Sequence, residues 1–166
     1  MRYLGKSSEP APLPMAKMRQ GIADYYATGT ELAQPQHLSL LIEACGKARQ
    51  IEEGLALLAE ALAATHRDGE RWCHAKLHQL WGELLRMQDA DPVEVEQHYW
   101  QAIEVARQQQ ARSWELRAVM SLCCLWREQG KQEEARQRLA EIYGWFTDGF
   151  DTSDLKEAKA LLEELS

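Results

Sequence analysis

The sequence lacks any apolar run near the length of about 18 residues that a membrane-spanning helix needs. The N-terminal segment 1–14 also lacks the apolar stretch of a signal peptide. An excess of Lys and Arg is missing as well, because the formal net charge is -7. Clustered cations displace counterions from nucleic acids, so this charge balance argues against a nucleic-acid surface. We therefore expect a cytoplasmic protein with neither membrane nor nucleic acid among its partners.

Short motifs of metal, redox and phosphate chemistry are missing too. His74 and His78 lie four residues apart next to Cys73, but no further ligand and no HExxH pattern accompanies them. We expect His78 to be a hydrogen-bonded core residue. Cys123 and Cys124 are adjacent, and side chains adjacent on a helix point about 100° apart, which disfavours a disulfide. With no GxxxxGK[ST] loop and no nucleophile–base arrangement, we expect no enzyme, no metal and no cofactor.

Glycine and proline are sparse, and apolar residues recur with the 3.6-residue period of helices throughout the long segments. Pro10, Pro12 and Pro14 make segment 1–14 an expected extended lead-in. Asp91 and Pro92 are a strong start signal, a capping residue followed by proline in the first turn. The sequence predicts eight helices, over residues 15–27, 35–48, 52–66, 71–87, 92–109, 113–129, 132–146 and 152–165.

The chain repeats its pattern of apolar and small residues every 40 to 41 positions. Five columns keep this step: Leu41, Trp81 and Leu122; Cys45, Leu85 and Trp126; Gly54, Val95 and Ala135; Leu58, Tyr99 and Leu139; Ala61, Ala102 and Ile142. Such a period is typical of arrays in which each unit buries its apolar face on its neighbour. It predicts one helical repeat domain over residues 15–166. The predicted parts are hairpins at 35–69, 71–110 and 112–147, and a terminal helix at 152–165.

Two of these hairpins resemble the tetratricopeptide repeat (TPR) family. The residues that carry the resemblance are Trp81, Gly82, Leu85, Val95, Tyr99 and Ala102, then Leu122, Cys123, Trp126, Gly130, Ala135 and Leu139. The family unit is roughly 34 residues, so these hairpins are longer. Arg49 stands where the family usually has glycine, and Ile142 where it has a small residue. The resemblance implies an all-α, right-handed α-solenoid that binds other proteins.

A closer likeness covers roughly residues 15–166. ERWCHAKLHQLWGELL and YGWFTDGFDTSDLKEAKALLEEL are similar to the C-terminal repeat region of large bacterial signalling proteins. Those proteins join a nucleotide cyclase or transcriptional-regulator domain to a predicted ATPase and then to such repeats. The likeness implies a regulatory or scaffolding interaction module in a bacterial signalling system. None of the enzymatic parts carries over, because their motifs are missing here.

The first helix of each hairpin lines the inner face of a helical solenoid. The repeat step places four rows on that face: Gln36, Lys76 and Arg117; Ser39, Gln79 and Met120; Glu43, Glu83 and Cys124; Gly46, Arg86 and Arg127. We predict a partner-binding groove formed by Lys76, Gln79, Glu83, Arg86, Arg117, Met120 and Arg127. Its four cations would anchor an acidic peptide or a C-terminal carboxylate, while Gln79 and Glu83 would orient it. In the alternative, these cations are solvated and paired locally with Glu83 or Glu128.

Two further hypotheses remain open. The groove could instead hold a small molecule or nucleotide, which would make the chain a sensor domain that regulates an ATPase or cyclase. The helix at 15–27 lacks a hairpin partner and carries apolar Met18, Ile22 and Tyr25, which could pair two chains into a homodimer. We expect Trp72, Trp100, Trp114 and Trp145 to pack between hairpins; alternatively, they form an exposed contact patch.

Overall fold

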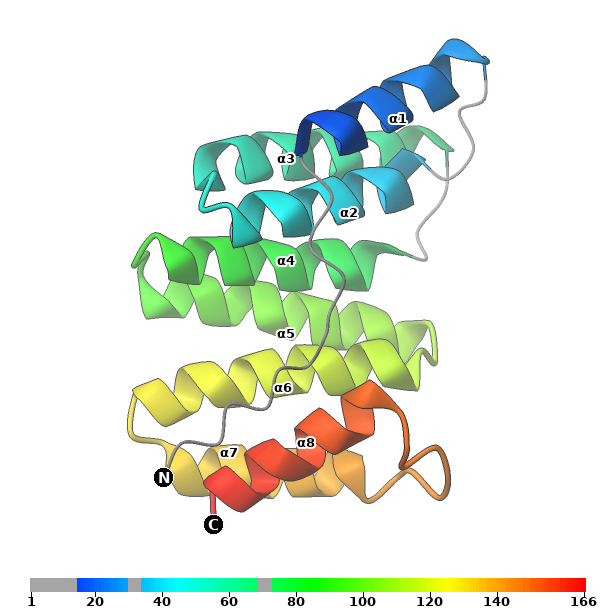
Figure 1. Ribbon diagram of the computed structural model, residues 1–166. Coiled ribbons are helices and arrows are strands. Elements are labelled where there is room, and N and C mark those ends of the chain that lie inside the picture. Colours follow the sequence, from blue (N-terminus) through cyan, green and yellow to red (C-terminus); the bar gives the residue numbers. More distant parts are fainter. Residues whose placement is uncertain (1–14, 30–33, 69–72) are drawn as a thin grey trace, which may run out of the picture. The chain divides into compact units, whose positions relative to one another are not determined.

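The computed structural model describes residues 15–29, 34–68 and 73–166, which form eight α-helices and no strand (Figure 1). The helices are α1 (Met15–Ala27), α2 (Gln34–Lys47), α3 (Ile51–Asp68), α4 (His74–Met87), α5 (Pro92–Gln108), α6 (Arg112–Glu128), α7 (Gln132–Tyr143) and α8 (Ser153–Glu164). The all-α class with eight helices is thus confirmed. The expected lead-in at 1–14 and Trp72 lie outside the described residues.

The chain divides into two compact units, Met1–Leu32 and Ala33–Ser166. The first unit contains α1, which buries none of its residues. The second unit contains the other seven helices. A single domain over residues 15–166 remains a prediction.

Within the second unit, each helix packs against the next one along the chain. In addition, α2 contacts α4, α4 contacts α6 and α6 contacts α8. These four helices therefore follow one another along one face, while α3, α5 and α7 alternate with them (Figure 1). The handedness of a solenoid built this way stays a prediction.

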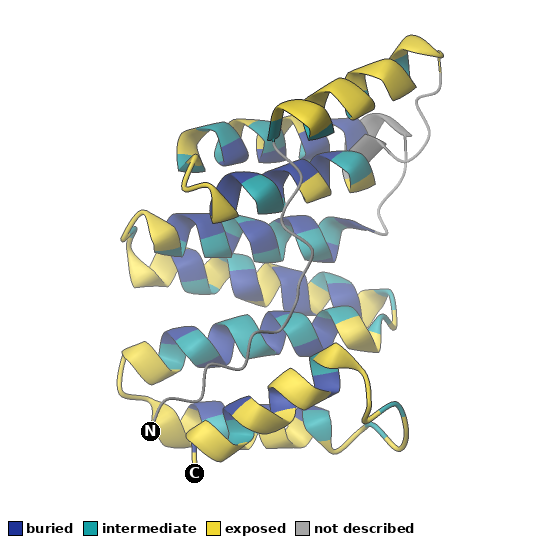
Figure 2. Cartoon of the chain, viewed as in Figure 1, coloured by how far each residue is buried: buried dark blue, intermediate teal, exposed yellow. Residues whose placement is uncertain are grey.

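Small residues let the helices approach closely where the repeat pattern places them. A Cβ atom on Gly54 of α3 would lie 2.8 Å from Leu84 Cδ1 and 3.3 Å from Cys45 Cβ. A Cβ atom on Gly82 of α4 would lie only 2.6 Å from Cε1 of Tyr99, whose side chain is fully buried. The column Leu58, Tyr99 and Leu139 is completely buried, and buried residues line the facing sides of α4 and α5 (Figure 2).

Helix ends follow local chemistry. The Asp91 carboxylate accepts a hydrogen bond from the Val93 amide at 2.9 Å and caps α5, as predicted. The prediction for α7 was three residues too long, because the helix ends at Tyr143 and the chain continues through turns. Turns between helices use left-handed backbone at Arg49 (φ 56°), Asp89 (φ 54°) and Gln110 (φ 54°).

Candidate functional site

The face formed by α2, α4, α6 and α8 contains two hollows. The first hollow, about 330 Å³, is lined by Ile42, Glu43, Gly46, Lys47, Lys76, Gln79, Leu80, Glu83, Leu84, Met87, Trp114 and Arg117. The second hollow, about 380 Å³, is lined by Gln79, Glu83, Arg86, Arg117, Met120, Ser121, Cys124, Asp154 and Glu157. We call the two hollows together the groove. Six of the seven predicted groove residues line it; the exception is Arg127.

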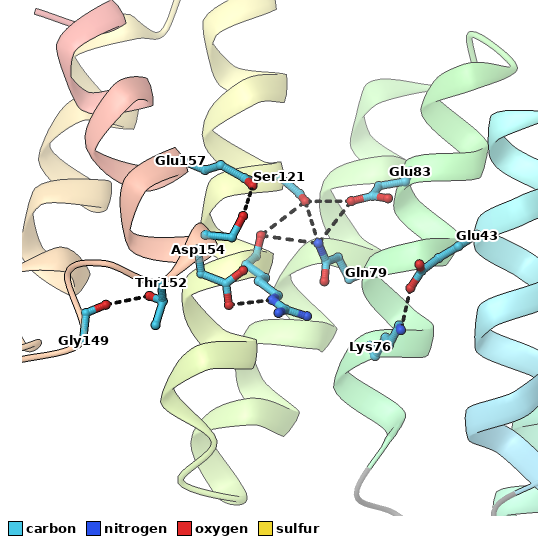
Figure 3. Close-up of polar contacts among 11 residues, drawn as sticks. Glu43, Lys76, Gln79, Glu83, Ser121, Gly149, Thr152, Asp154 and Glu157 are labelled. Carbon is cyan, nitrogen blue, oxygen red and sulfur yellow. Dashed lines mark hydrogen bonds and ion pairs between the residues drawn. The ribbon is translucent and has the colours of Figure 1, made fainter. Parts of the chain in front are cut away.

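Gln79, Glu83 and Arg117 border both hollows and form a polar partition between them. The Gln79 amide donates to Glu83 Oε1 at 3.1 Å and to Ser121 Oγ at 3.0 Å (Figure 3). The Ser121 hydroxyl donates to the same Glu83 oxygen at 3.0 Å. These bonds join α4 to α6 across the floor of the groove and fix the orientation of the Glu83 carboxylate.

Glu83 is the acidic group of the partition. Burial raises the pKa of its carboxyl above the ordinary value, since desolvation disfavours the charged form. The hydrogen bonds from Ser121 and Gln79 and the charge of Arg86 lower this pKa, but they do not offset the burial. The nearby Glu43 carboxylate raises it further.

Each of the four predicted cationic anchors is paired with a carboxylate on a neighbouring helix of the same face. Lys76 Nζ lies 2.5 Å from Glu43 of α2 (Figure 3). Arg117 Nε lies 2.8 Å from Asp154 of α8. Arg86 Nη1 lies 3.7 Å from Glu128 of α6. This pair agrees with the alternative in which the cations are paired locally.

The fourth anchor, Arg127, pairs with Glu164 of α8. All four cations therefore already have a carboxylate partner.

Trp114 is one of the groove residues that sequence reasoning missed. It lies on the wall of the first hollow, with Lys76 Nζ 5.7 Å and Arg117 Cζ 4.9 Å from its ring centroid. These distances are those of cation–π contacts. The signal was present, because Trp114 precedes Arg117 by three positions and so shares its helix face.

Trp100 of α5 is partly exposed, but its ring lies 6.2 Å from Trp126 of the next hairpin, as expected for packing between hairpins. Trp145 is exposed and contacts Arg112 of its own hairpin, which corrects the same expectation for Trp145.

Of the two histidines that suggested a metal, His78 belongs to a stack of rings with His98 and Trp81, whereas His74 meets His78 edge-on. His78 lies 5.8 Å from His98 by ring centroids, and His98 lies 4.9 Å from Trp81. Nδ1 of His78 is buried without a hydrogen-bond partner, so the expectation of a hydrogen-bonded residue is wrong for that atom. Burial, with the charges of His98 and His74, lowers the pKa of His78 to about 4. No group of three or more potential ligands that could hold a metal occurs within residues 15–29, 34–68 and 73–166.

The cysteines in the described part of the chain are free thiols. Burial, together with the neighbouring Cys124, raises the pKa of Cys123 to about 12. Its thiol lies 3.2 Å from the Ala135 carbonyl oxygen and donates to it. A thiol in this state is a poor nucleophile.

Among the described helices, none combines the length and the apolar character that crossing a membrane requires. In comparisons with known proteins, the sequence matches no protein-family model and no curated protein at a significant level.

Proposed function

We propose that this chain is a cytoplasmic protein-interaction module of the TPR-like type, which binds a segment of a partner protein in the groove. Its role would be regulatory or scaffolding, in a bacterial signalling system. The observation that carries the proposal is the first hollow, an apolar recess with a polar border on a face of stacked helices. Recesses of this kind accept an apolar side chain, while the polar border sets its orientation.

The walls of the first hollow suit an apolar anchor. Leu80 and Leu84 form its buried side, and Trp114 and the exposed Met87 lie at its border. Aromatic residues and methionine are enriched at protein interfaces, because they offer large contact areas and, in methionine, an adaptable shape. Removing such surface from water contributes about 25 cal/mol per Å². A leucine or phenylalanine of the partner would therefore supply most of the affinity.

An acidic partner, or a C-terminal carboxylate, would bind by exchange. It would have to displace Glu43 from Lys76 or Asp154 from Arg117. Ion pairs that stay partly exposed contribute little, about 0–1 kcal/mol, so this exchange is nearly neutral in free energy. Charge alone then adds little affinity, and the apolar anchor is needed for any partner.

Gly46 offers the test, because it lies in the wall of the first hollow. A Cβ atom there would lie 3.4 Å from Leu84 Cδ2 and 3.9 Å from Met87 Sδ, which leaves room for alanine. Leucine at the same position would extend into the hollow and fill it. Peptides would be selected from a displayed random library on the parent protein and measured by calorimetry against Gly46→Leu and Gly46→Ala.

We expect Gly46→Leu to weaken binding at least about tenfold, since an excluded anchor forfeits about 1.5–3 kcal/mol. Gly46→Ala should bind as the parent does, and circular dichroism should show equal helicity in all three proteins. Equal affinity of Gly46→Leu and the parent would place the binding surface elsewhere.

A sensor of a small molecule or nucleotide is the second candidate. The hollows of about 330 and 380 Å³ fall at the lower end of the range of about 300–1,000 Å³ for small-ligand sites. Thermal unfolding with a panel of nucleotides and metabolites separates the two functions. A ligand that raises the melting temperature of the parent, but not of Gly46→Leu, would favour the sensor.

A further inference from the structure

The polar partition of the groove holds one carboxylate that has no cationic partner among the described residues, and the nearest unpaired cation of the lining, Lys47, lies in the first hollow. Of the ionisable groups on the polar partition, Arg117 is paired with Asp154, whereas Glu83 takes part in no ion pair among the described residues. Glu83 accepts hydrogen bonds from Gln79 and Ser121, both through Oε1 (Figure 3). Its Oε2 atom therefore has capacity left for a donor from outside the chain.

The second hollow is lined by more carboxylates than cations. Its three carboxylates, Glu83, Asp154 and Glu157, face two guanidinium groups. Each guanidinium is already paired: Arg117 with Asp154 inside the hollow, and Arg86 with Glu128 outside it. Among the described residues, Glu83 and Glu157 have no ion pair, and Arg86 offsets the charge of Glu83 only in part, so a cation that enters the hollow meets an excess of carboxylates.

We infer that the partner segment carries a lysine or arginine beside its apolar anchor, and that Glu83 Oε2 accepts a hydrogen bond from that basic group. This inference rests on the proposed function. Glu83 borders both hollows, so an anchor in the first hollow leaves its neighbouring side chains at the partition. A basic side chain gains charge complementarity there, whereas an acidic one is repelled by Glu83.

The surroundings of Glu83 strengthen the pairing. Its carboxylate has lost much of its water, which costs free energy in the unbound protein and makes a cationic partner more favourable. Gln79 on the same helix and Ser121 on α6 hold it in place, so little side-chain freedom remains to be lost on binding. Arg86 on the same helix and Glu43 on α2 are the other charges that act on it.

The test uses short peptides selected from a displayed random library on the full chain. We expect selected peptides to share a large apolar residue adjacent to Lys or Arg. One such peptide is then compared with analogues in which norleucine or glutamate replaces the basic residue. In calorimetry, the norleucine analogue should bind about tenfold more weakly. This loss of affinity lies between the losses expected for an exposed and for a fully buried charge pair. The glutamate analogue should bind more weakly still.

Glu83→Gln is the matching protein variant, because glutamine keeps an oxygen for the bonds from Gln79 and Ser121. It should lower the affinity for the basic peptide about tenfold and leave the affinity for the norleucine analogue unchanged. Glu104→Gln, which removes the same charge from the exposed face of α5, should bind as the parent does. With the parent protein, affinity for the basic peptide should fall as the pH falls through the pKa of Glu83; with Glu83→Gln this decline should be absent.

The outcomes separate the two proposals. Peptides that bind Gly46→Leu as well as the parent, or a library that yields no binder, would overturn the proposed function and this inference with it. A second result would overturn the basic-partner inference alone and leave the groove as the binding site. In that result, Gly46→Leu weakens binding, but the selected peptides carry acidic residues beside the anchor, or Glu83→Gln leaves their affinity unchanged.

Discussion

Arg49 has a backbone conformation that side chains with a Cβ atom adopt reluctantly. Its φ of 56° places it in the left-handed region at the end of α2, where glycine commonly ends a helix. The equivalent position at the end of α6 is Gly130, with φ 77°. The sequence resemblance marked Arg49 as a departure from the family pattern, and the structure keeps the turn despite the departure.

We predict that Arg49→Gly raises the free energy of unfolding by about 1 kcal/mol, the order of the cost of left-handed backbone. Urea unfolding followed by circular dichroism would measure it. The converse change, Gly130→Ala, should lower stability by a similar amount. If Arg49→Gly has no effect or destabilises, the Arg49 side chain makes a compensating contribution to the folded state.

At the scale of elements, the hairpin of α4 and α5 combines close packing with a stack of rings. Gly82 admits the Tyr99 ring, and His78, His98 and Trp81 stack where the two helices meet. Burial lowers the pKa of His78 to about 4 and also lowers the pKa of His98. The folded hairpin therefore favours the neutral imidazoles.

This lowering predicts an acid-sensitive hairpin. The unfolded chain binds a proton at His78 near pH 6.5 and the folded chain only near pH 4. The stability linked to the neutral ring is fully present above pH 6.5 and is lost as the pH falls toward 4. We expect a steeper loss of unfolding free energy across this window for the parent than for His78→Gln. Equal slopes would show that the His78 ring titrates alike in both states.

The boundaries of the elements show how far sequence reasoning reaches. Starts such as that of α5 could be predicted, because Asp91 and Pro92 act locally. The end of α7 could not, because Trp145 and Phe146 continue the apolar pattern beyond Tyr143 while the backbone turns. For the groove, the repeat step predicted seven lining residues, and six of them line the two hollows. It could not reveal that Asp154 and Glu164 form ion pairs with Arg117 and Arg127, because α8 lies outside the repeated hairpins.

At the scale of the whole molecule, α1 belongs to a unit separate from that of the other seven helices and has no buried residue. The third hypothesis assigns it to self-association through Met18, Ile22 and Tyr25. If that holds, Ile22→Asp should convert a dimer into a monomer, because a charge in an apolar contact is costly to desolvate.

The mass in solution of Ile22→Asp and of the control Lys17→Asp, measured by light scattering, would decide this. The control changes an exposed residue on the same helix. A parent protein that is already monomeric, or an unchanged mass after Ile22→Asp, would refute self-association through α1.

The ion pairs of the groove face have a mechanical consequence. Lys76–Glu43 ties α4 to α2, Arg86–Glu128 ties α4 to α6, and the pairs of Arg117 and Arg127 tie α6 to α8. The apolar contacts between helices resist parting at any ionic strength, but these ties weaken as salt screens them. A ligand that loosened one tie would let neighbouring hairpins tilt apart on that side only. The array of helices would then bend away from the groove face. Occupancy of the groove would be expressed as a change in the curvature of the array.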